Sequence, residues 1–142
     1  MPMPGVEPSV VVDTGPIVAM LDADEAAHDW VMAQMRRLRP PLLTSEAVLS
    51  EAAFLVARAG AGPDVIPRLV TRGFVTVAKA FDEDADAVAN LMIRYRSVPM
   101  SLADACLVSL VERTPNASVF TLDSDFGIYR QKGRRIIPLL TP

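Results

Sequence analysis

Four acidic residues occupy positions that surface solvation does not explain: Asp13, Glu51, Asp104 and Asp123. Two of them follow short apolar runs, where buried strands would end, and two lie in apolar segments that are typical of helices. Four carboxylates gathered in a partly dry pocket would repel one another strongly. Such a cluster needs protons or a cation, and a ligand set made only of oxygen favours a hard cation such as magnesium or manganese.

Asp13 has two interpretations from the sequence. The run of valines at 10–12 is typical of a strand that is buried on both faces, and Gly15 and Pro16 then mark a turn and the start of a helix. In open α/β sheets, ligands bind beyond the carboxyl ends of such strands. Asp13 could instead simply cap the helix that follows, because aspartate is a common N-cap residue.

Glu51 lies in the middle of an apolar segment at 47–56, which is predicted to be helical. A carboxylate there is costly unless it meets water, a partner or a cation. Glu46, five residues earlier, points about 140° away around the helix and has a structural reason to lie in the first turn. Other acids are expected only to favour helix starts or polar faces, namely Asp22, Asp24, Glu25, Asp82, Glu83, Asp84 and Asp86.

The other candidate acids are Asp104, at the start of a predicted helix, and Asp123 and Asp125, just after a predicted strand. Asp104 stands at capping-box spacing from Ser101, but the helix that follows is nearly all apolar, so Asp104 marks the mouth of a buried element. Asp123 follows an apolar run in the same way as Asp13, whereas Asp125 could cap the turn after it. If the sheet is parallel, the four acids named first converge on one edge of it.

Predicted strands and helices alternate along the chain. Strands are predicted at 10–12, 42–43, 74–78, 119–122 and 136–140. Helices are predicted at about 16–21, 22–38, 46–59, 65–72, 82–95 and 102–113, with a helical turn at 125–130. This alternation predicts the α/β class, as one three-layer α/β/α domain over residues 1–142 with a mostly parallel five-stranded sheet. The proline-rich residues 1–8 are expected to be frayed.

Composition excludes several kinds of site. The net charge of the 142 residues is −3, so any contact with nucleic acid must be local. The only cysteine, Cys106, excludes an internal disulfide and is expected to be a small core residue. The only histidine, His28, excludes a multi-histidine zinc site and is expected to be a solvated helix residue. No stretch has the length of a membrane span or the pattern of a signal peptide, so the cytoplasm is expected.

Local positive charge does occur. The best candidates for phosphate contacts follow the last acidic motif: Arg130, Lys132, Arg134 and Arg135. A second group is Arg94 and Arg96, and a third is Arg36, Arg37 and Arg39. For each of them an ordinary solvated surface is the alternative. The apolar helix faces around Phe54 and Leu91 could pack on the core or form a dimer contact, and the sequence leaves both open.

Four motifs in order give the chain a resemblance to a known family. They are Val11-Val12-Asp13-Thr14, then Thr44-Ser45 through Glu51-Ala52-Ala53-Phe54-Leu55, then Ser101-Leu102-Ala103-Asp104-Ala105, and Thr121-Leu122-Asp123-Ser124-Asp125-Phe126. With this order and spacing the chain resembles PIN domains, and specifically the VapC-like toxins of bacterial toxin–antitoxin pairs. The motifs cover nearly the whole chain.

This resemblance implies the PIN fold and a metal-dependent endoribonuclease that uses Mg²⁺ or Mn²⁺. The implied catalytic and metal-binding quartet is Asp13, Glu51, Asp104 and Asp123. Asp125 matches an additional metal-site acid, and small polar residues of the site match Thr14, Ser101 and Thr121. The resemblance also implies products with a 5′-phosphate and a 3′-hydroxyl, a homodimer and a small antitoxin partner. Two alternatives remain: a non-catalytic PIN-like module that binds RNA or protein, and an RNA-processing nuclease that is not a toxin.

Overall fold

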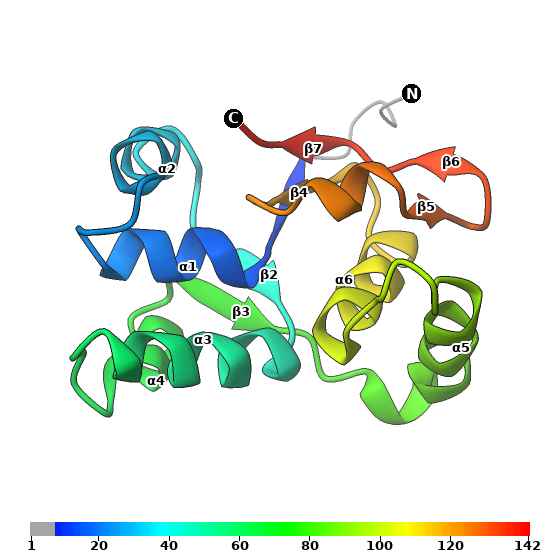
Figure 1. Ribbon diagram of the computed structural model, residues 1–142, viewed down its shortest axis with the longest axis horizontal. Helices are drawn as coiled ribbons and strands as arrows, with labels where there is room; N and C mark the ends of the chain where they lie inside the picture. The colour runs from blue at the N-terminus through cyan, green and yellow to red at the C-terminus, as the bar shows by residue number, and fades with distance from the viewer. Residues whose placement is uncertain (1–7) are drawn as a thin grey trace.

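A parallel sheet forms the centre of the computed structural model, which describes residues 8–142 (Figure 1). The expected frayed segment at 1–8 therefore lies almost entirely outside the described residues. Within them the main sheet has five strands in the order β3-β2-β1-β4-β7, and every neighbouring pair is parallel. Its strands are β1 (Ser9–Val12), β2 (Leu42–Thr44), β3 (Val75–Val77), β4 (Ala117–Phe120) and β7 (Leu139–Leu140). The predicted α/β class and five-stranded parallel sheet are confirmed.

Six α-helices connect the strands in the described part of the chain. They are α1 (Thr14–Leu21), α2 (His28–Met35), α3 (Glu46–Arg58), α4 (Val65–Thr71), α5 (Phe81–Arg94) and α6 (Leu102–Glu112). Helix α3 packs against both α1 and α6, and α6 also packs against α5 and β4. In Figure 1, α1 and α3 run side by side across the front of the molecule. None of the helices in residues 8–142 combines the length and hydropathy needed to cross a membrane.

The core explains why β1 lies at the centre of the sheet. Val11 and Val12 are fully buried, as expected for a strand covered on both faces. Phe120 of β4 is also fully buried and makes an edge-on contact with Trp30 of α2, with ring centroids 5.8 Å apart. Leu107 of α6 adds another completely buried side chain. Each such residue contributes roughly 1.5–3 kcal/mol of transfer free energy, so β1 and β4 are strongly held together.

The segment predicted to begin the second helix forms a turn instead. Asp22 ends α1, its carboxylate accepts a hydrogen bond from the backbone N–H of Asp24, and helix α2 begins only at His28. His28 is half-buried, with Nδ1 2.6 Å from the carbonyl oxygen of Ala19. His28 is a helix residue as expected, but it is not simply solvated, because its ring links the start of α2 to the carbonyl of Ala19 in α1.

The C-terminal elements also differ from the prediction. The strand expected at 136–140 enters the main sheet only at Leu139–Leu140, and the helical turn expected at 125–130 is a short 3₁₀ helix, η1 (Ser124–Gly127). Two short strands, β5 (Arg130–Gln131) and β6 (Arg135–Ile136), pair in an antiparallel ribbon that the sequence did not predict. Lys132 and Gly133 lie in its turn with φ of 51° and 78°, a backbone that suits a tight hairpin.

Candidate active site

Adjacent strand ends place Asp13 beside Thr121. Strands β1 and β4 are in register, and Val12 faces Phe120 across the pair. The Thr121 hydroxyl donates to Asp13 Oδ2 at 2.8 Å, and the backbone N–H of Thr14 donates to Asp13 Oδ1 at 2.8 Å. Asp13 is thus the N-cap of α1 and also a buried carboxylate beside β4. The capping interpretation of Asp13 is confirmed, and the carboxylate also lies at the strand edge where the other interpretation predicts a ligand site.

Thr121 also positions the next acid along the chain. Its hydroxyl accepts a hydrogen bond from the backbone N–H of Asp123 at 2.9 Å. Asp123 Oδ1 in turn accepts from the backbone N–H of Asp125 at 2.9 Å and caps η1. The side chain of Asp125 is half-buried but is not among those that line the cleft described below.

Asp104 enters the site from the first turn of α6. Ser101 is the N-cap of this helix, its hydroxyl accepts from the Asp104 N–H, and the Ser101 N–H donates to Asp104 Oδ2, each at 3.0 Å. This reciprocal pair is a capping box with aspartate in the place usually taken by glutamate or glutamine. The same Asp104 oxygen also accepts from the hydroxyl of Tyr129 at 3.2 Å.

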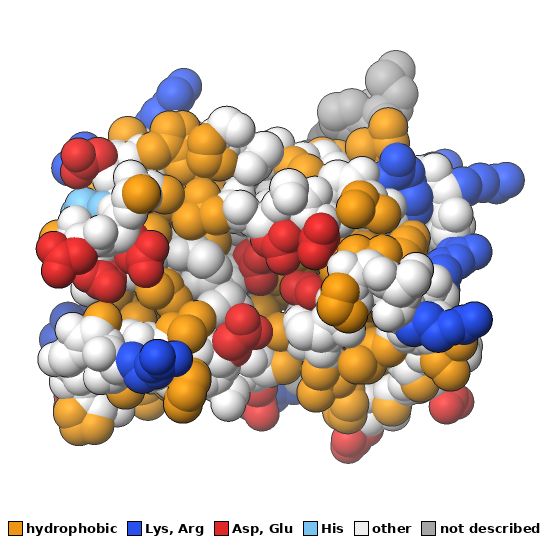
Figure 2. All heavy atoms as spheres, in the orientation of Figure 1, with side chains coloured by type: hydrophobic (Ala, Val, Ile, Leu, Met, Phe, Trp, Pro, Cys, Tyr) orange, Lys and Arg blue, Asp and Glu red, His pale blue; other side chains and the backbone are white. Residues whose placement is uncertain are grey.

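A cleft of about 320 Å³ brings the predicted quartet together: Asp13, Glu51, Asp104 and Asp123 all line it. Thr14 lines it as well, and acidic side chains gather in the middle of the face shown in Figure 2. Glu46 lines a different hollow, which it shares with Cys106, so the choice of Glu51 over Glu46 agrees with the geometry. Cys106 is only half-buried and takes no part in the acidic cleft.

Glu25 is a cleft residue that no sequence motif identifies. It was expected to serve only a polar surface, yet it lines the cleft from the turn between α1 and α2. That turn replaces the predicted helix start, and no local motif indicates where it points. A fifth carboxylate in the lining increases the negative charge that anything entering the cleft meets.

Burial and mutual repulsion perturb two of these acids. Burial raises the pKa of Asp13 to about 6, although hydrogen bonds from Thr121 and Thr14 oppose the rise, and the charges of Asp104 and Asp123 add to it. Burial also raises the pKa of Glu51, again with help from Asp104. These shifts are the result expected when carboxylates share a partly dry site without a counter-charge.

The Thr14 hydroxyl is another sign of an incomplete site. It is buried, and it makes no hydrogen bond of acceptable geometry with any described residue, although it lies close enough to Glu51 to lower the pKa of that carboxyl. Buried polar groups are normally satisfied, so an orphaned hydroxyl beside four carboxylates indicates a missing polar ligand. Oxygen donors of this kind match a hard divalent cation. As they stand, no three acidic, histidine or cysteine side chains within residues 8–142 form a ready coordination set, so a cation would have to draw the carboxylates together.

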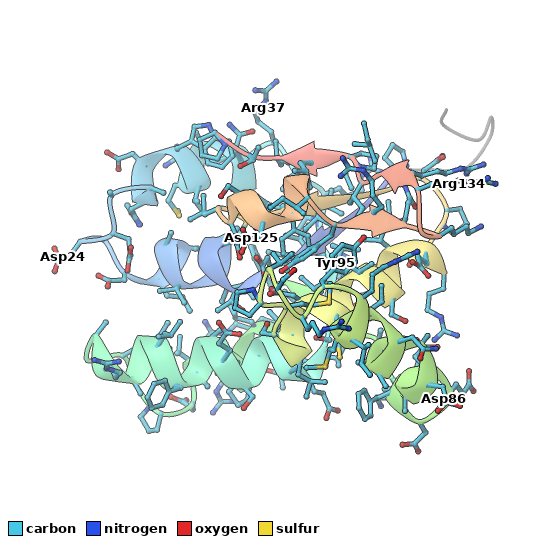
Figure 3. The ribbon with its side chains drawn as sticks, turned by 45° about the vertical axis from the view of Figure 1, so that its right-hand side comes forward. Asp24, Arg37, Asp86, Tyr95, Asp125 and Arg134 are labelled. Atoms are coloured by element: carbon cyan, nitrogen blue, oxygen red, sulfur yellow. The ribbon has the colours of Figure 1, made fainter. Side chains whose placement is uncertain are left out.

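The predicted phosphate-contacting residues divide into two kinds. Nη1 of Arg130 donates to the carbonyls of Gly127, Ile128 and Tyr129 at 2.7, 3.1 and 3.0 Å, so this guanidinium closes the end of η1. Exposed basic side chains of the β5–β6 ribbon are Lys132, Arg134 and Arg135. Figure 3 shows Arg134 projecting outward at the edge of the molecule. Arg94 lies against the same ribbon, because a Cβ on Gly133 would come within 2.9 Å of its Nη1.

The family model that describes the PIN domain matches residues 10–132. The chain belongs to the PIN domain family. It is 27% identical over 116 residues to Ribonuclease VapC26 of Mycobacterium tuberculosis, a match that covers 80% of this chain and 86% of that protein. The crystal structure of VapC20 from the same organism, described as a sarcin-ricin loop cleaving toxin, superposes with a TM-score of 0.73 at 20% identity. That match covers 84% of this chain and 94% of VapC20, and it confirms the PIN-like fold.

Proposed function

We propose that this PIN domain protein is a metal-dependent endoribonuclease and the toxin of a VapBC-like toxin–antitoxin pair. The observation that carries the proposal is the convergence of Asp13, Glu51, Asp104 and Asp123 on one cleft, from two strand ends and two helices. The likeness to VapC26, a protein named as a ribonuclease, supports the same activity. We assign the whole of 1–142 to a single domain.

The four cleft acids are the residues that would hold Mg²⁺ or Mn²⁺. When bound, such an ion lowers the pKa of water and offsets negative charge on the scissile phosphate. Thr121 holds Asp13 through its hydroxyl, and Asp125 holds Asp123 through its backbone N–H, so both acids are oriented before any ligand arrives. We assign Asp125 this supporting role, and we propose that its carboxylate is an additional ligand for the metal ion.

RNA is the proposed substrate, cleaved to leave a 5′-phosphate and a 3′-hydroxyl. Structured ribosomal RNA containing the sarcin-ricin loop is a first substrate to assay, because VapC20 is described as cleaving that loop. A cytoplasmic location, a homodimer and a small antitoxin partner belong to the same proposal. The acidic cleft repels RNA phosphates, so positive charge on the β5–β6 ribbon has to offset that repulsion.

Divalent-ion binding tests the proposal directly. We expect calorimetry to detect Mn²⁺ binding to the wild type and at least tenfold weaker binding to Asp104→Asn, whose remaining oxygen can still accept from Ser101. Asp86→Asn is the control, because Asp86 is exposed on α5 and lies outside the cleft (Figure 3). Wild-type protein that binds no Mn²⁺ at millimolar concentration and does not cut RNA would point instead to a non-catalytic PIN-like module.

Arg134→Gln is expected to weaken RNA binding without changing Mn²⁺ affinity. Removing one phosphate contact should lower the slope of log K against log salt by about 0.7–1, whatever the RNA sequence. Binding is measured by fluorescence anisotropy in EDTA, which prevents cleavage. Arg68→Gln is the control, since Arg68 pairs with Asp64 on α4, away from the ribbon. An unchanged salt slope for Arg134→Gln would remove the ribbon from the RNA-binding surface.

A further inference from the structure

Tyr129 is a fully buried tyrosine whose hydroxyl reaches the acidic site. Its side chain has no exposed surface, and it lies one residue beyond Ile128, the C-cap of η1. A buried phenolic hydroxyl needs a hydrogen-bond partner, and here the partner is Asp104 Oδ2 at 3.2 Å. A phenol is protonated at neutral pH, so the Tyr129 hydroxyl is the donor in this hydrogen bond.

Aromatic packing holds the Tyr129 ring in one orientation. It makes edge-on contacts with Tyr95 and Phe126, with centroid distances of 5.1 and 5.2 Å. Phe126 belongs to η1 and is fully buried, and Tyr95 is the C-cap of α5. The ring therefore packs against side chains from two elements, α5 and η1, which restricts where its hydroxyl can lie.

The two oxygens of Asp104 consequently differ. Oδ2 accepts from both the Ser101 N–H and the Tyr129 hydroxyl, whereas Oδ1 has no partner among residues 8–142. Two donors on one oxygen prevent the carboxylate from rotating about its terminal torsion, which is otherwise broad. Asp104 also lines the cleft, so the unpartnered oxygen is the one left for a ligand there.

We propose that Tyr129 is a positioning residue that turns Asp104 toward the bound cation. This inference rests on the proposed metal-dependent function. It extends the site beyond the acidic quartet to a residue that no carboxylate pattern identifies. Hydrogen-bond partners that orient metal ligands are typically worth 10- to 100-fold in metal affinity.

Two matched variants test the proposal. Tyr129→Phe keeps the ring and both edge contacts but removes the donor to Asp104. Tyr95→Phe removes a hydroxyl from the neighbouring ring. That hydroxyl accepts a hydrogen bond from the backbone N–H of Arg130 at 3.0 Å and makes no hydrogen bond to an acidic side chain of the described residues. We expect calorimetry to show about tenfold weaker Mn²⁺ binding for Tyr129→Phe and wild-type binding for Tyr95→Phe. Thermal melting of the metal-free proteins reports how much stability each hydroxyl contributes.

The possible outcomes are distinct. Wild-type Mn²⁺ affinity in Tyr129→Phe would overturn the positioning role while leaving the proposed nuclease intact. Equal weakening in both variants would also overturn it, because loss of packing would then explain the effect. Wild-type protein without Mn²⁺ binding would remove the proposed function and this inference together.

Discussion

Asp13→Asn is expected to abolish RNA cleavage, with a loss of at least a thousandfold, and to make the metal-free protein more stable at neutral pH. The loss of activity follows from removing the most deeply buried charge of the proposed metal site. The gain in stability has an electrostatic cause. Asparagine has nearly the same shape, but it does not carry a charge into the buried end of β1.

The pH dependence of that gain follows from the pKa of Asp13. Folding raises this pKa from 3.8 to about 6, so the folded state binds the proton more tightly than the unfolded state. The free energy of unfolding therefore falls as pH rises from about 4 to about 6, by up to roughly 3 kcal/mol from this group. Asparagine recovers part of this loss, and a gain of roughly 1–2 kcal/mol would raise Tm by about 3–8 °C.

Melting temperatures of the two proteins in EDTA provide the measurement. At pH 7.5 Asp13→Asn should melt above the wild type, and at pH 4.5 most of the difference should vanish because the wild-type carboxyl is then protonated. Asp86→Asn, which changes an exposed acid, should match the wild type at both pH values. A variant that melts below the wild type at pH 7.5 would show that the hydrogen bonds to Asp13 outweigh the cost of burying its charge.

Glu51→Gln is expected to lower RNA cleavage at least 100-fold with little change in stability. Glu51 is the only acid of the quartet that α3 supplies to the cleft. Because Glu51 is exposed, removing its charge leaves the packing of the core unchanged. Partial burial, and after it repulsion by Asp104, raises the pKa of Glu51; both penalties disappear with the charge, which should slightly favour the folded state.

Glu46→Gln is the matched control for this prediction. The two glutamates share one helix, but Glu46 lines the separate hollow beside Cys106. Cleavage rates of a labelled RNA in Mn²⁺ should therefore fall only in Glu51→Gln, and the melting temperatures of both variants should stay within about 2 °C of the wild type. Equal loss of activity in both variants would mean that the face of α3 was assigned incorrectly.

The acidic quartet could be predicted because its positions follow from simple geometry. Parallel strands end at a common edge, so aspartates that follow β1 and β4 meet once these strands are neighbours. Helical periodicity separates Glu51 from Glu46 for a similar reason. The register that sets Val12 opposite Phe120 was not predictable, because it depends on how the two strands pack in the complete core.

The features that the sequence did not reveal depend on tertiary packing or on very short elements. The β5–β6 ribbon has two residues in each strand, too few for any alternation to be recognised. Glu25 reaches the cleft from a turn that the sequence represents as a helix start. Tyr129 contacts Asp104 across 25 residues of sequence, and no spacing rule links a tyrosine to that acid. The sequence indicates a phosphate contact for Arg130, but in the structure its guanidinium donates to three backbone carbonyls.

The pairing of β1 with β4 determines when the proposed site can assemble during synthesis of the chain. Asp13 and Thr121 are 108 residues apart in sequence, and strand β4 must be in place before the site can assemble. Such a distant contact forms late, after most of the chain has been synthesised. A nascent chain that contains Asp13 and Glu51 but not yet Asp104 and Asp123 has only two of the four acids of the proposed site. The proposed site can therefore assemble only once residues near 123 have been synthesised and are free to fold.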